Sequence, residues 1–250
     1  GSKRMRLLFL FLVLCGSALA GPAYRDGPGP CEVSVLDTIH VESFDAKVTY
    51  PKTGDGPAPV IVFSHGLYGS KDNYQPLARF WASHGYVVIQ PTHPDSLQQG
   101  FQQRNDAMRA WDERPKQVSL VLDSLGTIEE KTGRKLDREK IGVGGHSFGA
   151  HTSMLVGGAL VYPGLLAEGK SFRDPRAKCT LLISPQGVGG LLRKDSWKDY
   201  PVPALVITGS EDTSPINDTK PENRLDPYNL GPAGRMHLVW IEGAHHGFGG

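Results

Sequence analysis

The residues most able to do chemistry in this sequence lie around Ser147, the centre of a G-x-S-x-G pentapeptide at residues 145–149. Residues 140–144 before it predict a short buried strand, and residues 150–159 after it predict a helix rich in small side chains. A serine on such a sharp strand-to-helix turn presents its Oγ at the sheet edge, and its glycine neighbours let the helix approach the strand closely. The pattern therefore predicts Ser147 as the nucleophile of an acyl-transfer reaction.

A serine hydroxyl is a weak nucleophile at neutral pH, so it needs a general base that is itself oriented by a third group. The candidates for that third group follow the strand predicted at residues 204–208. Asp212 is favoured, because a turn of the form x-E-D-x-x-P presents the aspartate more naturally than Glu211, which stays the alternative.

Two adjacent histidines, His245 and His246, are the candidates for the base, and both follow the strand predicted at residues 237–241. An isolated histidine is usually structural or exposed to solvent. Here the serine, the acid and the histidine follow one another in the chain, each just past the carboxyl end of a predicted strand. The three groups are therefore expected to converge on one edge of a sheet.

Acyl transfer also needs hydrogen-bond donors for the oxyanion that develops on the substrate. One donor is expected from the backbone N–H of Phe148, and the other from the N–H of Leu67 in the loop at residues 64–69. His65 in this loop is an alternative base, although an H-G pair at such a position more often shapes the loop.

Several other polar and aromatic residues near these positions could take part in binding or simply pack. Tyr68 and His146 are candidate substrate-pocket residues. His93, Asp95 and Trp111 lie in or near the long stretch after the strand predicted at residues 86–89. They are expected to be loop and packing residues.

No motif for a cofactor or a metal is found. Gly142 and Gly144 begin a pattern like a dinucleotide fingerprint, but Ser147 stands where its third glycine belongs, so no NAD site is predicted. There is no C-x-x-C and no H-E-x-x-H, so a zinc site has no support. With 27 basic and 26 acidic residues, the net charge of +1 gives no reason to expect nucleic acid as a partner.

The 250-residue chain is long enough for one large domain. Strands are predicted at residues 33–41, 46–50, 59–63, 86–89, 140–144, 180–183, 204–208 and 237–241, and helices at residues 73–84, 114–131 and 150–159. Strands that alternate with helices predict a mostly parallel sheet with helices on both faces. No internal repeat is visible, so residues 32–250 are expected to form a single domain with long connections at 185–203 and 214–232.

The N-terminus has the pattern of a secretory signal peptide. Basic residues at positions 3, 4 and 6 precede the apolar run at residues 7–14, and A-x-A follows at residues 18–20. The apolar run is short of the roughly 20 residues that span a bilayer, so no stable membrane insertion is expected. Gly1 and Ser2 look like a cloning remnant, and a lipoprotein signal at Cys15 fits poorly after the bulky Leu14. Export is expected, to the periplasm or the medium, with a flexible leader at residues 21–31.

Two cysteines, Cys31 and Cys179, remain once the signal peptide is removed. An oxidising compartment permits a disulfide between them. Two unpaired thiols are the alternative, because the sequence does not supply the geometry of the pair.

Four motifs resemble the predicted dienelactone hydrolase group, whose members have the α/β-hydrolase fold. They are FSHGL at residues 63–67, HGYVV at 84–88, GHSFGA at 145–150 and GAHHGF at 243–248, within a similarity that runs from about Val60 to the C-terminus. The group is close to the platelet-activating-factor acetylhydrolases and, more distantly, to chlorophyllases and bacterial polyester hydrolases. The resemblance implies Ser147 as nucleophile, the N–H groups of Leu67 and Phe148 as the oxyanion hole, and His246 as the base of the G-A-x-H pattern.

The chain departs from these relatives at three points. Platelet-activating-factor acetylhydrolases take their acid from the end of the strand after the elbow, where this chain has Ser184 and no carboxylate. This difference favours Asp212 as the acid and argues against platelet-activating factor as the substrate. Dienelactone hydrolases proper use a cysteine nucleophile, and relatives usually continue into a final helix, whereas this sequence ends at Gly250. A truncated or a minimal form is expected.

The sequence therefore predicts a secreted serine hydrolase that cleaves carboxylic esters through an acyl-enzyme, without a cofactor. One alternative is a polyester or cutinase-like hydrolase with an open, aromatic-lined cleft. Another is a non-catalytic binding protein with the same fold, which a complete set of serine, acid and histidine makes unfavourable. A peptidase has no support in the sequence. The acyl chain, the alcohol and the oligomeric state are left open.

Overall fold

The structure of the chain is a computed structural model that describes residues 29–100, 108–165, 168–214 and 219–248. The expected signal peptide, Cys15 and most of the leader expected at residues 21–31 lie outside the described residues. Within the described ranges, no helix is both long enough and apolar enough to cross a membrane.

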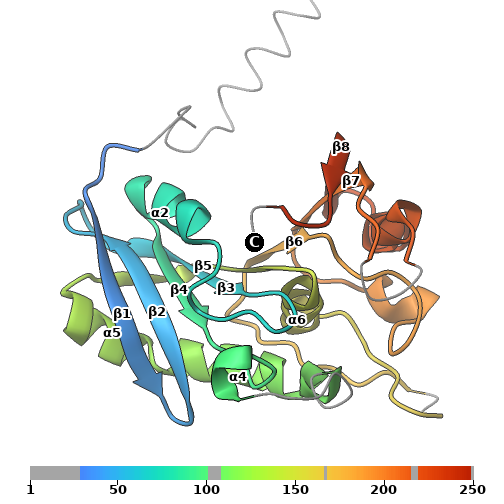
Figure 1. Cartoon of the computed structure of the whole chain (residues 1–250), viewed down its shortest axis with the longest axis horizontal. Coiled ribbons are helices and arrows are strands. Elements are labelled where there is room, and N and C mark those ends of the chain that lie inside the picture. Colours follow the sequence, from blue (N-terminus) through green and yellow to red (C-terminus); the bar gives the residue numbers. More distant parts are fainter. Residues whose placement is uncertain (1–28, 101–107, 166–167, 215–218, 249–250) are drawn as a thin grey trace, which may run out of the picture.

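The described residues form an eight-stranded sheet in the order β1-β2-β4-β3-β5-β6-β7-β8 (Figure 1). The strands are β1 (Val33–Val41), β2 (Phe44–Pro51), β3 (Ala58–Ser64), β4 (Val87–Pro91), β5 (Leu136–His146), β6 (Cys179–Ile183), β7 (Ala204–Glu211) and β8 (Met236–His245). β2 pairs antiparallel with both β1 and β4, and all the other neighbours pair in parallel. The predicted mostly parallel sheet is confirmed.

Helices cover both faces of this sheet, as predicted. They are α2 (Gln75–Ser83) on one face and α4 (Glu113–Asp123), α5 (Leu125–Thr132) and α6 (Phe148–Gly157) on the other. Successive side chains of a strand point to opposite faces. Val60 and Val62 of β3 therefore pack with α4 and α5, whereas the ring of Phe63 packs edge-on against Trp81 of α2 at 5.4 Å.

The prediction of one helix over residues 114–131 is wrong, because the chain turns at Ser124. The Ser124 hydroxyl donates to the carbonyl of Leu120 at 2.9 Å, in addition to the helical bond from the Ser124 N–H at 3.1 Å, and such a side-chain bond often bends a helix. A second helix then begins at Leu125. Its buried residues Leu125 and Ile128 join the same core cluster as α4, so the apolar periodicity continued through the break.

The long connections contain short helices that the sequence did not predict. They are η1 (Leu97–Gln99), η2 (Met108–Trp111), η3 (Lys194–Trp197), η4 (Pro221–Leu225) and α7 (Asp226–Leu230). η3 packs against α6 through Trp197, which is fully buried. The Nε1–H of Trp197 lies 3.3 Å from the sulfur of Met154 in α6. The connection between β6 and β7 is therefore packed against α6 and belongs to the core.

Cys31 and Cys179 are both free thiols, so the disulfide alternative is not realised. Cys179 is the first residue of β6, and its side chain is exposed. The N–H of Cys31 donates to the carbonyl of Ser83 at the end of α2, at 3.0 Å.

Candidate active site

Ser147 lies on the turn between β5 and α6, where its backbone adopts φ 55° and ψ −116°. A positive φ is uncommon for a residue with a side chain, and such strain persists only where the surroundings impose it. The two flanking positions must be glycine, because a Cβ at either would clash with the backbone. A Cβ on Gly145 would lie 2.3 Å from the backbone of Gly149, and a Cβ on Gly149 would lie 2.0 Å from the carbonyl oxygen of Ser64. The sharp turn and its small neighbours are present as expected from the sequence.

The hydroxyl of Ser147 faces His246. His246 Nε2 lies 2.9 Å from Ser147 Oγ, and His246 Nδ1 lies 2.7 Å from Asp212 Oδ1. A carboxylate can only accept, so Nδ1 carries the proton and Nε2 is left as the acceptor for the serine hydroxyl. This is the tautomer that a general base requires.

Asp212 is completely buried at the end of β7. Its carboxylate accepts hydrogen bonds from Ser184 Oγ at 2.6 Å and from Thr208 Oγ1 at 2.8 Å. Burial acts to raise the pKa of Asp212, but the hydrogen bonds from His246 and Ser184 and the charge of Arg224 outweigh it and lower that pKa. The carboxyl group is therefore held ionised beside the histidine.

Arg224, which no sequence pattern indicated, supplies the counter-charge of the buried acid. It lies in η4 with 2% of its surface exposed, and its Nε lies 2.9 Å from Asp212 Oδ1. Its Nη1 donates to the carbonyls of Ser184 and Pro185 at 3.1 and 3.0 Å. The guanidinium thus joins the ends of β6 and β7, and no local pattern in the polar stretch around it indicated burial.

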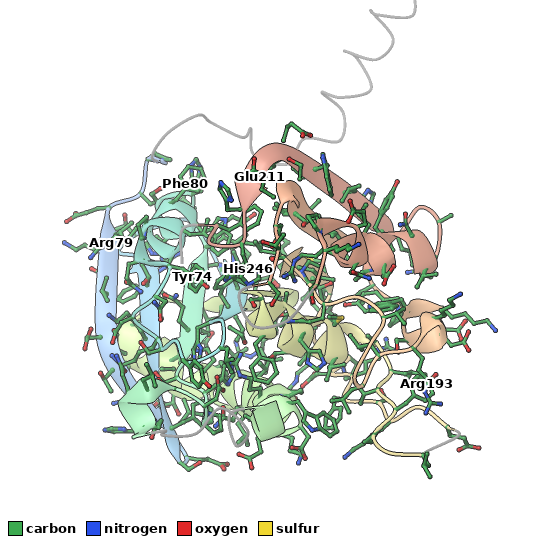
Figure 2. The ribbon with its side chains drawn as sticks, turned by 45° about the vertical axis from the view of Figure 1, so that its right-hand side comes forward. Tyr74, Arg79, Phe80, Arg193, Glu211 and His246 are labelled. Carbon is green, nitrogen blue, oxygen red and sulfur yellow. The ribbon has the colours of Figure 1, made fainter. Side chains whose placement is uncertain are left out.

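The alternative residues Glu211 and His245 contact each other, separately from the site. His245 Nε2 lies 3.0 Å from Glu211 Oε2, and the two side chains are 75% and 54% exposed. Figure 2 shows His246 toward the middle of the molecule and Glu211 nearer its edge. Of the two acid–histidine pairs that the sequence left open, only Asp212 and His246 reach Ser147.

His146 is buried between the helix-α2 side of the site and the segment that carries His246. Its Nε2 donates to the backbone carbonyl of His246 at 2.5 Å, which leaves Nδ1 to accept from the hydroxyl of Tyr74, also at 2.5 Å. Burial, with the neighbouring His246, lowers the pKa of His146 to about 4, so the ring is neutral at physiological pH. Both ring nitrogens are engaged by protein groups, and Figure 2 shows Tyr74 to the left of His246.

The loop expected to carry the second oxyanion donor lies against the elbow. A Cβ on Gly66 would lie 3.7 Å from the carbonyl oxygen of His146, and Leu67 and Tyr68 are partly buried beside it. His65 is buried within this loop. Its Nε2 accepts from the N–H of His93 at 2.9 Å, so Nδ1 carries the proton and donates to the carbonyl of Gly66 at 2.6 Å.

The environment of His65 is unsuited to a general base. Its burial, and the charge of Arg114, lower the pKa of the ring to about 3. Both of its nitrogens are engaged by backbone groups, of His93 and Gly66, whereas Ser147 Oγ is within hydrogen-bond distance of His246. The geometry agrees with a loop-shaping role for the H-G pair.

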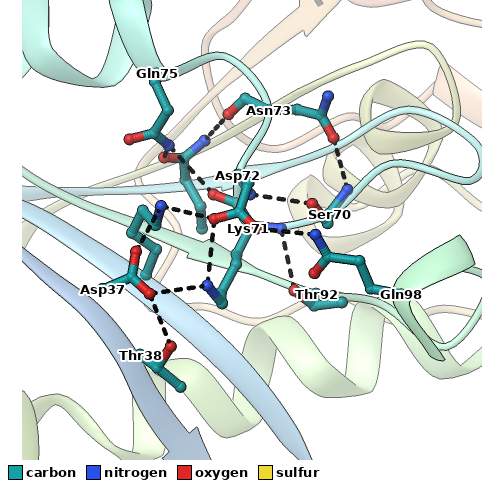
Figure 3. A network of polar contacts seen from close by, with 11 residues as sticks. Asp37, Thr38, Ser70, Lys71, Asp72, Asn73, Gln75, Thr92 and Gln98 are labelled. Atoms are coloured by element: carbon teal, nitrogen blue, oxygen red, sulfur yellow. Dashed lines mark hydrogen bonds and ion pairs between the residues drawn. The ribbon is translucent and has the colours of Figure 1, made fainter.

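A second polar network braces the segment that follows this loop (Figure 3). Lys47 of β2 lies 2.6 Å from Asp72 and 2.9 Å from Asp37, and Lys71 lies 3.2 Å from Asp72. Burial acts to lower the pKa of Lys47, but Asp72 and Asp37 outweigh it and raise that pKa. The N–H of Lys71 also donates to Thr92 Oγ1 at 3.0 Å. The network ties the loop to β1, β2 and the end of β4.

Two other features of the described residues, their metal-ligating side chains and one cavity, add nothing to the site at Ser147. No group of three or more His, Cys, Asp or Glu side chains there could hold a metal ion. A cavity of about 380 Å³ lies away from Ser147, lined by Leu122, Leu125, Arg138, Glu139, Ile141, Pro175, Arg176 and Lys178. The cations that line it already pair with acidic side chains, as Arg138 does with Glu129 at 2.9 Å.

A model of the dienelactone hydrolase family matches residues 44–249. Platelet-activating factor acetylhydrolase of Cavia porcellus is 27% identical over 239 residues, which cover 79% of this chain and 49% of that protein. Cutinase est1 of Thermobifida alba is 27% identical over 211 residues, covering 78% of this chain and 61% of the cutinase. Cutinase est2 of the same organism is 27% identical over 246 residues, covering 92% of this chain and 70% of that cutinase. The chain thus spans about half of the acetylhydrolase and less than two thirds of est1.

The fold has a counterpart among solved structures. A Klebsiella pneumoniae protein assigned as a dienelactone hydrolase superposes with a TM-score of 0.63 at 18% identity, covering 87% of this chain and 88% of that one. At that identity the likeness concerns the fold, and the family match over most of the chain carries the assignment. The chain is therefore a hydrolase that belongs to the dienelactone hydrolase family, within the α/β-hydrolase superfamily.

Proposed function

We propose that this protein is a serine hydrolase that cleaves carboxylic esters through an acyl-enzyme on Ser147. The observation that carries the proposal is the continuous hydrogen-bonded path from Ser147 Oγ to His246 Nε2, at 2.9 Å, and from His246 Nδ1 to Asp212 Oδ1, at 2.7 Å. This is the arrangement in which a base can take the serine proton while a carboxylate holds its tautomer.

In the proposed reaction, Ser147 Oγ attacks the ester carbonyl as His246 Nε2 takes its proton. The oxyanion of the tetrahedral intermediate accepts hydrogen bonds from the N–H groups of Leu67 and Phe148. Collapse expels the alkoxide, which His246 protonates, and leaves an acyl group on Ser147. His246 then takes a proton from water as the water attacks the acyl group. Collapse of this second tetrahedral intermediate breaks the bond to Ser147 Oγ and releases the carboxylic acid, while His246 returns the proton to Ser147 Oγ. Asp212 stays ionised throughout and stabilises the imidazolium.

Hydrolysis of p-nitrophenyl acetate and labelling by a fluorophosphonate test this proposal. We expect the wild-type protein to release p-nitrophenol and to carry one phosphonyl group on the peptide that contains Ser147. Ser147→Ala is expected to lose both signals. His246→Gln is expected to lose turnover, while His245→Gln serves as the matched control because that side chain is 75% exposed and faces Glu211. Turnover and labelling that persist in Ser147→Ala would reject the proposal.

A polyester hydrolase is the second candidate, favoured by the similarity to two cutinases. The chemistry on Ser147 is the same, and only the substrate differs. Release of soluble acids from a polyester film, compared with turnover of esters of increasing acyl length, separates the two candidates. Platelet-activating factor is a weaker candidate substrate, because Ser184 occupies the place where those relatives are expected to carry the acid.

We also propose that the protein is exported, on the basis of the charged, apolar and A-x-A segments within residues 3–20. Expression of the full chain in a bacterium, followed by N-terminal sequencing of the exported product, tests this. A mature chain that begins near Gly21 is the expected result. Retention of the full-length chain in the cytoplasm is the opposing one.

A further inference from the structure

A buried ion pair lies behind the oxyanion loop, joining helix α4 to the loop after β4. Arg114 and Asp95 are both 0% exposed, and they meet through two parallel contacts of 2.7 Å, from Nε to Oδ1 and from Nη2 to Oδ2. A buried pair of this kind gives little net stability, because desolvation of the two charges offsets their attraction. Stability by itself is therefore a weak account of the pair.

The remaining donors of Arg114 form hydrogen bonds to the backbone of the loop that carries Leu67. Nη1 donates to the carbonyl of His65 at 2.8 Å, and Nη2 donates to the carbonyl of Gly66 at 3.1 Å. On the other side of Leu67, the N–H of Tyr68 donates to Asp95 Oδ2 at 3.2 Å. The pair thus holds the peptide groups on both sides of Leu67.

The contact with Gly66 has a direct geometric consequence. The Gly66 carbonyl and the Leu67 N–H belong to one peptide group, and in a planar trans peptide they point in opposite directions. The guanidinium and the Nδ1–H of His65, at 2.6 Å, together fix the direction of the carbonyl and therefore also the direction of the N–H. Hydrogen bonds in a chain polarise one another, so the positive charge on this carbonyl makes the Leu67 N–H a better donor.

The same guanidinium also contacts the residue that supplies the other expected donor. Arg114 Cζ lies 4.3 Å from the centre of the Phe148 ring. Phe148 is the first residue of α6, and its ring is 5% exposed. One side chain therefore touches the two segments that carry Leu67 and Phe148, and it holds them in a fixed mutual position.

We propose that Arg114, paired with Asp95, is a positioning residue that aims and polarises the Leu67 N–H of the oxyanion hole. The inference rests on the proposed ester hydrolysis and adds a residue to it. Arg114 has no contact with Ser147, His246 or Asp212 among the described hydrogen bonds and ion pairs, so it touches the loop of the hole and not the catalytic side chains.

A pair of substrates that differ in one atom tests this proposal. An oxoester places an oxygen anion in the hole, whereas the matching thionoester places a sulfur anion, which is larger and a poorer hydrogen-bond acceptor. We expect Arg114→Lys to lower kcat/KM for the oxoester by roughly 100-fold, mainly through kcat, as is typical when one oxyanion donor is lost. The thionoester is expected to lose much less, so the ratio of the two rates falls. This ratio does not depend on the fraction of folded enzyme.

Arg176→Lys is the matched control. Arg176 also pairs with a buried aspartate, Asp174, at 2.7 Å and donates to a carbonyl, that of Ser119, at 3.2 Å, but it lies by the remote cavity. Its replacement is expected to leave the ratio unchanged. Should Arg114→Lys fold poorly, the double variant Arg114→Met with Asp95→Leu removes both charges together and is expected to show the same fall in the ratio.

The outcomes separate this inference from the proposed function. The positioning role would be overturned if Arg114→Lys lowers the rates for both esters by the same factor, so that their ratio is unchanged, while the wild-type enzyme turns over both. A wild-type protein that hydrolyses neither ester, or a Ser147→Ala variant that keeps its activity, would instead overturn the proposed function.

Discussion

Ser184 Oγ lies 2.6 Å from Asp212 Oδ2, although the two residues end different strands and are 28 positions apart. Ser184 follows β6 with a positive φ of 55°, and Asp212 follows β7. The serine hydroxyl also lies 2.7 Å from His246 Nδ1, so it touches both the acid and the base. At the position where some relatives are expected to carry the acid, this chain has a group that supports an acid on the next strand.

Replacing Ser184 with alanine tests that support. The variant loses a hydrogen bond to a buried charged group, so we expect the free energy of unfolding to fall by about 1.5–3 kcal/mol. We also expect kcat to fall, by roughly tenfold, because the carboxylate loses one of the groups that orient it. Urea denaturation and turnover of p-nitrophenyl acetate measure the two effects. Ser83→Ala, which removes another buried and hydrogen-bonded hydroxyl far from the site, should lower stability only. Equal activity of both variants would contradict the prediction.

The choice between the two acidic residues is tested by Asp212→Asn and Glu211→Gln. An amide at position 212 would donate to His246 Nδ1 and impose the wrong tautomer, so kcat is expected to fall by roughly 1,000- to 10,000-fold. Glu211→Gln breaks only an exposed pair with His245 and is expected to change kcat less than twofold. Steady-state kinetics of both variants give the answer, and a larger loss in Glu211→Gln would reverse the assignment.

Two glycine-to-alanine changes are expected to have opposite effects, one where α6 approaches β3 closely and one on the open surface of α5. In Gly149→Ala the new Cβ would meet the carbonyl oxygen of Ser64 at 2.0 Å, so we expect the free energy of unfolding to fall by about 3 kcal/mol or more, with loss of activity. Gly126 lies on the exposed side of α5 with nothing within 4 Å of the added Cβ. Gly126→Ala is expected to gain about 0.5–1 kcal/mol. Chemical denaturation measures both, and a stable, active Gly149→Ala variant would refute the packing argument.

Buried neutral histidines predict acid lability. His151 of α6 is buried, and burial, with the charge of Arg114, lowers its pKa to about 4 from the ordinary 6.5. Between these values the unfolded chain binds a proton that the folded chain does not, so the free energy of unfolding falls as the pH falls through this window. His151→Gln, which cannot titrate, is expected to reduce this slope by up to about 1.4 kcal/mol per pH unit. Thermal or urea unfolding between pH 4 and 7 measures it. An unchanged slope would exclude His151 from the titration.

The fold was largely predictable because most of its strands and helices have local sequence patterns. Short apolar runs between helical patterns predicted a mostly parallel sheet, and the glycines around Ser147 predicted the turn that they form. The break of the predicted helix at Ser124 was missed, since the apolar spacing of α4 continues into α5. η3, η4 and α7 were missed because burial against distant elements, as with Trp197 on α6, has no local signature.

By itself, the sequence determined the chemistry that the site could carry: a serine on a glycine-flanked turn, followed in order by acidic residues and histidines at strand ends. It left Asp212 and Glu211, and His245 and His246, as adjacent alternatives. In the tertiary structure only Asp212 and His246 form a hydrogen-bonded path to Ser147, because neighbouring residues at a strand end point to opposite sides. It also brought in Ser184, Arg224, Arg114 and Asp95, whose partners lie 12 to 62 positions away. Such contacts come from packing, which spacing along the chain does not encode.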